Sequence, residues 1–168
     1  MINQRKLIRT FISEIAASLH GARVTDTSNV MWHGHSIKQE KPKDEADDTV
    51  KVSLCVVFLN GKVLCVSRGP GSQLFGFPGG KREIGERGKD AAIRELKEET
   101  GLDTEEISHI TTIKNDSKVI SYYKIKASGT LMPSEEGDLA LASVEEMKDS
   151  ANFPWAEYNK LVFQEIGY

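Results

Sequence analysis

The chain has 168 residues and a net charge of −3, with 39% hydrophobic and 28% charged residues. This composition supports a folded core of about one domain and excludes a collagen-like, mucin-like or wholly disordered chain. The acidic balance disfavours the whole protein as a polyanion binder, but a bound divalent cation reverses the local field, so a small phosphate ligand stays open. The longest apolar run, residues 54–59, is too short to cross a membrane.

Residues 1–49 are expected to be an addition to the main domain. Apolar side chains recur at helical spacing over 3–20, which predicts an amphipathic helix packed on the main domain or on a second copy of the chain. The start lacks the unbroken apolar stretch of a secretory signal, so we expect a cytoplasmic protein. Residues 36–48 are almost all charged or polar and predict a linker or solvated strip. His33 and His35 alone are weak evidence for a metal site and predict a loop.

The main domain is predicted to span residues 50–168 and to open with a β-hairpin. Apolar runs at 50–59 and 62–67 flank Asn60-Gly61, which is a strong two-residue turn signal. In that register Cys55 and Cys65 point to opposite faces of the hairpin. We therefore expect two buried thiols and no disulfide.

The rest of the main domain mixes helical and strand patterns. The predicted elements are a glycine-rich stretch at 69–80, a helix over 87–100 ended by Gly101, strands over 106–114, 118–126 and 138–142, a short helix opened by a capping box at 143–146, and a closing helix with Pro154 in its first turn. Strands interrupted by helices predict an α/β or α+β layered sandwich, with helices on a mixed sheet.

Three glutamates gather on one face of the predicted helix over 87–100. Glu95, Glu98 and Glu99 are spaced i, i+3, i+4 and fall within an arc of roughly 100°. Because like charges at this spacing repel, a hard divalent cation such as Mg²⁺ or Mn²⁺ is the natural compensation. Arg94 can orient a carboxylate by a charge-assisted hydrogen bond. The alternative is a solvated acidic face that Arg94 and Lys97 partly compensate.

Residues 80–102 resemble the signature box of the Nudix hydrolases. That box is a glycine, five residues, a glutamate, seven residues, and then Arg-Glu-apolar-x-Glu-Glu-x-Gly-apolar. The constrained positions that match here are Gly80, Glu86, Arg94, Glu95, Leu96, Glu98, Glu99, Gly101 and Leu102. Phe77-Pro78-Gly79-Gly80 also resembles the family's approach to the box. The resemblance covers 50–168 and implies an α/β/α sandwich with a mixed sheet, to which residues 1–49 add a helical extension.

The resemblance implies hydrolysis of a nucleoside diphosphate linked to another moiety, with Mg²⁺ or Mn²⁺ as the cofactor. It implies these roles by position: Glu95, Glu98, Glu99 and the Gly79 carbonyl as metal ligands, Glu98 or Glu99 as the base, Arg94 as the orienting residue, and Glu86 at the helix start beside the ligands. Arg87 departs from the family, which often has Ser or Thr there as an N-cap, and this weakens the helix start.

Residues outside the box are candidates for substrate and metal contacts. Glu136 resembles a downstream acidic ligand of enzymes that cleanse oxidised guanine triphosphates, and a solvated acidic turn is the alternative. Arg68 ends a predicted strand and is a candidate phosphate contact or an ordinary exposed arginine. Residues 153–157 resemble the stretch with which those enzymes read the base.

Within that stretch Glu157 replaces an asparagine, and its carboxylate can accept from the N–H groups of guanine. Trp155 or Phe75 could stack on a base, and packing at the core or rim is the alternative for both.

The expected substrate is a nucleotide, with a (d)NTP or an oxidised purine nucleotide first. The alternatives are hydrolysis of ADP-ribose, a nucleotide sugar, a dinucleoside polyphosphate or an RNA cap, and last a non-catalytic nucleotide-binding module. The family's proline of ADP-ribose cleavers is absent at Asp116, and the tyrosine of dinucleoside polyphosphate cleavers is absent from 117–120. We expect no membrane partner, and no nucleic-acid partner beyond a capped RNA end.

Overall fold

The structure is a computed structural model that describes residues 30–32, 35–40, 49–114, 118–132, 134–135, 137–149, 151 and 153–168. The helix predicted over 3–20 and the candidate ligand Glu136 lie outside these described residues. No helix in the described ranges is long and apolar enough to span a membrane.

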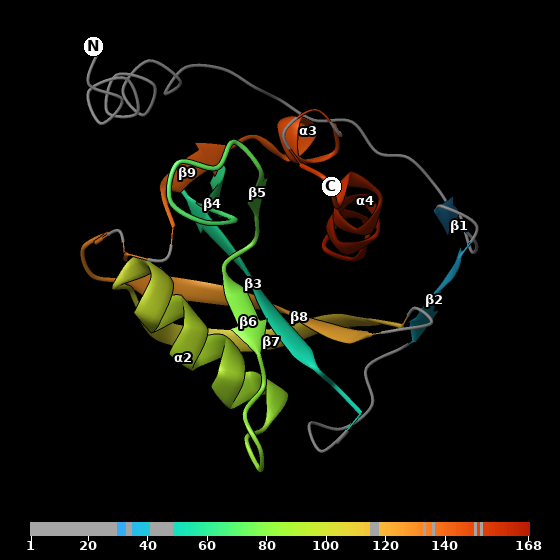
Figure 1. Ribbon diagram of the computed structural model, residues 1–168, viewed down its shortest axis with the longest axis horizontal. Helices are drawn as coiled ribbons and strands as arrows, with labels where there is room; N and C mark the ends of the chain where they lie inside the picture. The colour runs from blue at the N-terminus through green and yellow to red at the C-terminus, as the bar shows by residue number, and fades with distance from the viewer. Residues whose placement is uncertain are drawn as a thin grey trace.

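A mixed sheet forms the centre of the fold (Figure 1). β3 (Val52–Leu59) runs parallel to β8 (Val119–Ser128), and β7 (Asp103–Lys114) pairs antiparallel with the other edge of β8. The short β6 (Gly79–Lys81) pairs antiparallel with the first half of β3. Gly79 and Gly80 of β6 therefore lie beside β3, a central strand of the sheet.

The predicted hairpin at Asn60-Gly61 is confirmed, and its second strand leads into a smaller antiparallel group. Asn60 and Gly61 have φ values of 51° and 76°, as a tight hairpin turn requires. β4 (Lys62–Ser67) pairs with β3 only next to the turn, then diverges to pair with β5 (Phe75–Gly76) and β9 (Leu139–Ala142).

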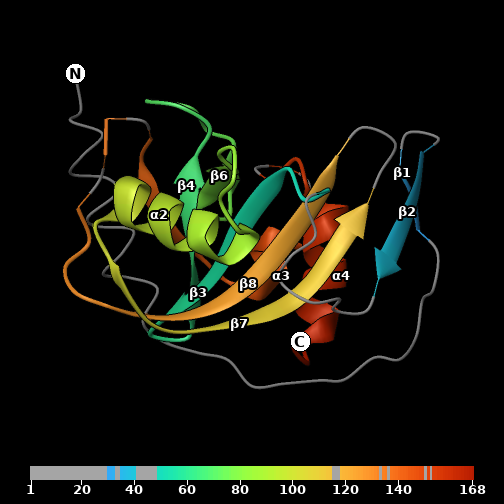
Figure 2. The ribbon, with the colours of Figure 1, turned by 90° about the horizontal axis from the view of Figure 1, so that it is seen from below.

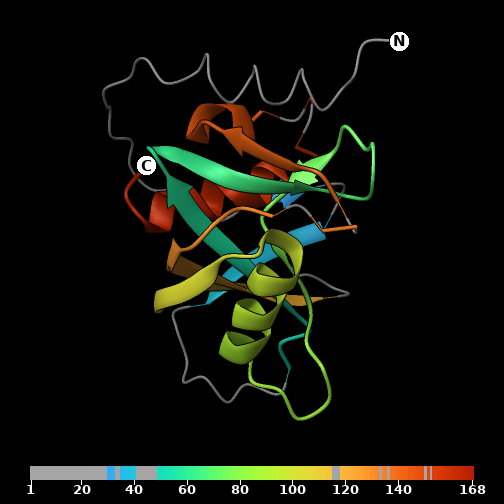
Figure 3. The same cartoon turned by 90° about the vertical axis from the view of Figure 1, so that its left-hand side faces the viewer.

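Helices cover both faces of the sheet (Figures 2 and 3). α2 (Gly88–Thr100) packs on one face through Ala92 and Leu96, whereas α3 (Val144–Met147) and α4 (Ala156–Glu165) pack on the other face. The expected α/β/α sandwich with a mixed sheet is thus confirmed. α2 ends at Gly101 in the left-handed conformation, and α3 carries the predicted capping box. α4 starts later than expected, because Pro154 lies in the turn that precedes it.

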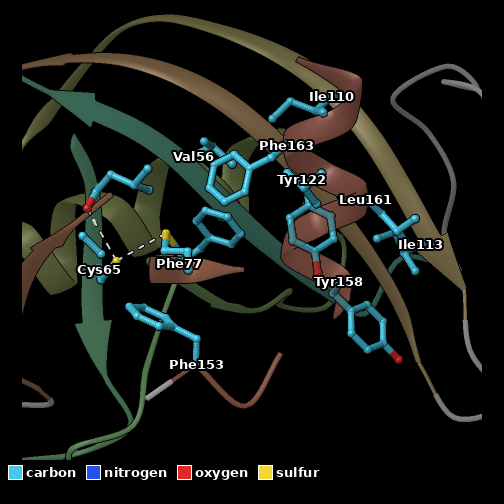
Figure 4. Packing of buried hydrophobic residues seen from close by; sticks show 14 residues of the cluster. Val56, Cys65, Phe77, Ile110, Ile113, Tyr122, Phe153, Tyr158, Leu161 and Phe163 are labelled. Carbon is cyan, nitrogen blue, oxygen red and sulfur yellow. Dashed lines mark hydrogen bonds between the residues drawn. The ribbon is translucent and has the colours of Figure 1, made fainter. Parts of the chain in front are cut away.

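The side chains of β3 and β4 divide between the two layers. Cys55 packs in the cluster under α2, and Cys65 packs in the larger cluster under α3 and α4, where its thiol lies 3.6 Å from the Met147 sulfur. In this larger cluster the Phe77 ring lies edge-on to Tyr122 at 6.0 Å between centroids (Figure 4). Both cysteines are free and buried, as the alternation of the hairpin predicts.

Two regions differ from the sequence expectation. The glycine-rich stretch at 69–80 contains β5 and the start of β6. Both strands are too short to show the alternation of apolar and polar residues that marks a strand in a sequence. The stretch at 36–48, expected as a linker or solvated strip, starts with β2 (His35–Glu40), which pairs with β7 and with β1 (Val30–Trp32). His35 accordingly lies in a strand and not in a loop. Backbone hydrogen bonds to an existing sheet edge allow a polar segment to form a strand without alternating apolar residues.

The buried cysteines give a test of the packing on both faces. Burial raises the pKa of Cys65 to about 12 and also raises the pKa of Cys55. Since only thiolates react, we expect native Cys65 to react about a thousandfold more slowly than an ordinary thiol, and Cys55 to be protected as well. Thiol labelling followed by mass spectrometry should detect no fast adduct in buffer and two adducts in denaturant. Fast labelling of either cysteine in buffer would contradict the packing.

Candidate active site

Two adjacent glycines bring the acidic face of α2 close to β6. Gly79 has a φ of 134°, and a Cβ there would overlap the backbone oxygen of Ser53. A Cβ on Gly80 would lie 2.5 Å from the carboxylate carbon of Glu95. Gly79 therefore lets β6 lie close to β3, and Gly80 leaves room for the Glu95 carboxylate beside β6.

One arginine binds three of the carboxylates. The Arg94 side chain donates two parallel hydrogen bonds to Glu86, from Nε to Oε1 at 3.0 Å and from Nη2 to Oε2 at 3.1 Å. Its Nη1 donates to Glu95 Oε1 at 2.9 Å and to Glu98 Oε2 at 3.0 Å. Nη2 also donates to the backbone oxygen of Lys81 at 3.1 Å, which ties α2 to the end of β6. Arg94 thus contacts three of the four acidic side chains directly.

The remaining glutamate of the cluster is oriented by the backbone of β6. The Gly79 N–H donates to Glu99 Oε2 at 2.7 Å. Glu95 is only 14% exposed, whereas Glu98 is 56% exposed. The structure therefore brings together Glu86, Glu95, Glu98 and Glu99 around one guanidinium and one backbone N–H.

These contacts also set the ionisation of the cluster. The hydrogen bond from Arg94 lowers the pKa of Glu86 below its ordinary value, and the hydrogen bonds that Arg94 donates, to Glu86 first and then to Glu95 and Glu98, raise the pKa of Arg94. Glu86 is therefore ionised at neutral pH. Cys55 lies below α2, where its thiol donates to the Ala92 carbonyl at 3.1 Å. Burial raises its pKa, and the negative charges of Glu99 and Glu95 add to this shift, so Cys55 is not an activated nucleophile.

The donor chemistry of this cluster fits a hard divalent cation. Carboxylate oxygens of Glu95, Glu98 and Glu99 share one helix face, and the backbone of Gly79 lies beside Glu99. Such oxygen donors suit Mg²⁺ or Mn²⁺. In the described ranges, no three Asp, Glu, His or Cys side chains lie close enough together to hold a metal ion as they stand. Glu95 and Glu98 face Arg94 instead, so cation binding would require these carboxylates to share their oxygens with the ion.

Three of the candidate substrate residues lie together near the end of β4. Arg68 follows β4, and its Cζ lies 4.3 Å from the ring centroid of Trp155. Phe75 pairs with Ser67 of β4, and Trp155 contacts the neighbouring Gly76 position. Glu157 lies in the first turn of α4, where it accepts a hydrogen bond from Lys160 at 2.6 Å. The predicted Arg68, Trp155 and Phe75 group is therefore one neighbourhood.

Sequence reasoning missed the residues under the start of α2. Gly88 is buried, and a Cβ there would lie 2.6 Å from the Tyr123 hydroxyl and 3.3 Å from Ser53 Oγ. Arg87, the N-cap residue, makes no side-chain cap hydrogen bond. The close packing of Gly88 on the sheet thus holds the start of a helix that has no side-chain cap. A glycine at the first helical position, which is unfavourable in itself, is the signal in the sequence.

Replacing Gly88 with alanine tests this close approach. Gly→Ala in a helix normally stabilises a protein by about 0.5–1 kcal/mol. Here we expect G88A to lower the free energy of unfolding by about 1–3 kcal/mol, because the buried Tyr123 ring has little room to move. The double variant G88A/Y123F should recover a large part of that loss in urea unfolding. Equal stability of G88A and the wild type would contradict the proposed contact.

The hydrogen bonds between Glu86 and Arg94 predict a pH-dependent contribution to stability. Because the pKa of folded Glu86 is lowered, its contribution is present above the unfolded pKa and is lost as the pH falls through the folded pKa. E86Q should therefore lower the free energy of unfolding by about 1–2 kcal/mol at pH 7, and by progressively less as the pH falls from the unfolded pKa of about 4.3 through the lower folded pKa.

Urea unfolding at pH 7 and pH 3 measures the effect of E86Q. E145Q is the matched control, since Glu145 is exposed and, among the described residues, forms its ion pair with Lys148 at 3.1 Å. It should change stability by less than about 0.5 kcal/mol. A loss in E86Q that is the same at both pH values would show that its charge is not responsible.

Comparison with known proteins agrees with this geometry. The sequence model of the NUDIX domain matches residues 49–165. The fold is similar to the Bacillus subtilis pyrophosphohydrolase BsRppH, with 20% identity and a TM-score of 0.61 over 84% of this chain and 99% of that one. It is also similar to the Escherichia coli ORF135 protein, with 25% identity and a TM-score of 0.54 over 70% and 88% of the two chains.

A third similar structure is a MutT protein from work on Aliivibrio salmonicida and Vibrio cholerae, with 21% identity and a TM-score of 0.55 over 66% of this chain and 95% of that one. The family match spans strands β3 to β9, the helix with its acidic face and α4 together. The chain therefore belongs to the Nudix family of pyrophosphohydrolases.

Proposed function

We propose that this protein hydrolyses the diphosphate linkage of a nucleotide, with a purine nucleoside triphosphate as the first candidate substrate. The observation that carries the proposal is the acidic face of α2, which Arg94 and the Gly79 N–H hold against β6. Glu95, Glu98, Glu99 and the carbonyl of Gly79 would hold Mg²⁺ or Mn²⁺ there. Such a cation supplies neutralisation of the diphosphate charge and a more acidic water.

We assign the residues of α2 different parts in this reaction. Glu98 is the better candidate for the base, because its exposed carboxylate can accept a proton from water. Glu99 is the weaker candidate for the base, because a hydrogen bond from the backbone of β6 holds its carboxylate in one position. Arg94 is a positioning residue that acts through Glu86, Glu95 and Glu98. Glu136 stays a proposed further ligand, because it lies outside the described residues.

The preference for a purine nucleotide rests on the group at the end of β4 and on α4. Trp155 and Phe75 are half-buried aromatic residues next to an exposed cation, Arg68. Among the described residues Glu157 pairs with the exposed Lys160, and such a surface pair costs little to break. Its carboxylate is thus available to accept from the N–H groups of a guanine edge. These features support a base and a phosphate site in one neighbourhood.

Location and domain organisation are also part of the proposal. Two buried free thiols suit a reducing compartment, which supports action in the cytoplasm. Residues 1–49 are proposed as an addition to the domain at 50–168, with its helix over 3–20 packed on that domain or on a second copy. The pairing of β2 with β7 gives this addition a point of attachment to the sheet.

Replacing Glu98 tests the proposed reaction. E98Q keeps the shape of the side chain but removes the proposed base, so turnover should fall by about 10²–10⁴-fold. The exposed pair with Arg94 contributes little to stability, and the variant should unfold within about 1 kcal/mol of the wild type. The measurement is Mg²⁺-dependent release of phosphate or pyrophosphate from nucleoside triphosphates, nucleotide sugars, dinucleoside polyphosphates and capped RNA.

The control for this experiment is E145Q, which removes an exposed glutamate outside α2 and should keep full activity. Preferred cleavage of a substrate other than a purine triphosphate would correct the proposed substrate but leave the reaction in place. Wild-type turnover no higher than that of E98Q for every substrate would overturn the proposal and favour a nucleotide-binding module.

A further inference from the structure

The guanidinium of Arg68 covers the ring that was proposed as a base platform. Its Cζ lies 4.3 Å from the Trp155 ring centroid, within the distance of a cation–π contact. Arg68 is exposed, whereas Trp155 is half-buried and packs against the main core cluster. The indole therefore has one side on the core and Arg68 on its accessible side.

The backbone around Arg68 is fixed, so any movement belongs to its side chain. The Arg68 N–H donates to the Leu74 carbonyl at 2.9 Å, and the preceding Ser67 N–H donates to the Asp138 carbonyl at 2.9 Å. Asp138 in turn accepts from the Gly71 N–H at 2.9 Å. These bonds hold both ends of the turn after β4, and they leave the long Arg68 side chain able to change rotamer.

The Arg68 guanidinium keeps its hydrogen-bonding capacity in this position. It makes no hydrogen bond or ion pair with any residue of the part of the chain that the structure describes. A guanidinium carries five N–H donors, which suit phosphate oxygens in particular. Arg68 is therefore a group suited to phosphate that is held on an aromatic ring, with no anionic partner among the described residues.

We propose that Arg68 is a latch that couples base binding to phosphate binding. A nucleobase that stacks on Trp155 takes the place of the guanidinium, and the released Arg68 side chain binds the diphosphate of the same nucleotide. In the proposed exchange the guanidinium leaves the ring as the base arrives, so the base contact and the phosphate contact form together. This inference rests on the proposed function, because it assumes a nucleotide that carries both groups.

The relative strengths of the two contacts permit this exchange. An exposed cation–π contact is worth about a two- to fivefold factor in an equilibrium constant. Stacking of a base on an aromatic side chain is worth about a five- to 150-fold factor. A base therefore displaces the guanidinium, and inorganic pyrophosphate, which has no base, has to remove Arg68 from the ring without compensation.

The experiment measures binding of the two halves of the ligand separately. The chain has two tryptophans, so W32F leaves Trp155 as the fluorescent reporter. In this background, guanosine, adenosine and inorganic pyrophosphate are titrated with and without R68A. We expect R68A to bind nucleosides about two- to fivefold more tightly, because the competing group is gone, and to bind pyrophosphate at least about tenfold more weakly.

Two further variants separate stacking from charge. R68K keeps the charge but loses the planar stack, so it should bind nucleosides more tightly than the wild type and keep most of its pyrophosphate affinity. K124A removes an exposed positive charge from β8 and should change neither affinity. Since Arg68 is exposed, R68A and R68K are expected to unfold at the same urea concentration as the parent.

The proposed coupling would be overturned if R68A bound nucleosides with unchanged or weaker affinity. It would also be overturned if nucleosides left the fluorescence of Trp155 unaltered. Either result is independent of the hydrolysis assay with E98Q, so the proposed function could still hold. Conversely, tighter nucleoside binding by R68A without turnover of any nucleotide would support the latch and overturn the proposed reaction.

Discussion

The guanidinium of Arg94 makes the acidic face of α2 possible. Glu86, Glu95 and Glu98 all hydrogen bond to it within 3.1 Å, at a position that is only 26% exposed. Without that charge the carboxylates would repel one another and turn away from β6. Arg94 carries one positive charge beside these glutamates, so its contacts order more negative charge than they balance. A divalent cation would add positive charge beside carboxylates that the protein already orients.

Close backbone packing gives this charge cluster its position. Glycines allow a close approach at three points: Gly79 of β6 against β3, Gly80 of β6 against the Glu95 side chain, and Gly88 at the first turn of α2 against Tyr123. At each of them a Cβ would meet either a backbone atom, the Glu95 carboxylate or the Tyr123 hydroxyl. The electrostatics of the site thus depend on the absence of side chains as much as on the glutamates. Hydrophobic packing of Leu96 and Ala92 under the helix then holds the spacing.

The sequence could predict those features whose causes are local. The hairpin at Asn60-Gly61, the end of α2 at Gly101 and the capping box at Ser143 follow from turn and cap chemistry. The box also predicted which glutamates share a helix face. β2 and the Gly88 contact could not be predicted, because each depends on a partner far away in the chain. A polar strand such as β2 is defined by the β7 edge that it meets, and no periodicity records this.

The geometry of β5 and β6 adds a constraint on what the site can accept. Gly76 of β5 lies against Trp155, and Gly79 of β6 donates to Glu99, so a segment of three Cα–Cα steps joins the aromatic group to the acidic cluster. Such a segment spans at most about 10 Å. Both ends are anchored, because Pro78 accepts from the Cys55 N–H at 2.8 Å and β5 pairs with β4. A ligand that uses both ends must therefore hold its aromatic group and its charged linkage at a fixed short separation. A single nucleotide does so, whereas a longer ligand can engage both ends only through one of its nucleotide units.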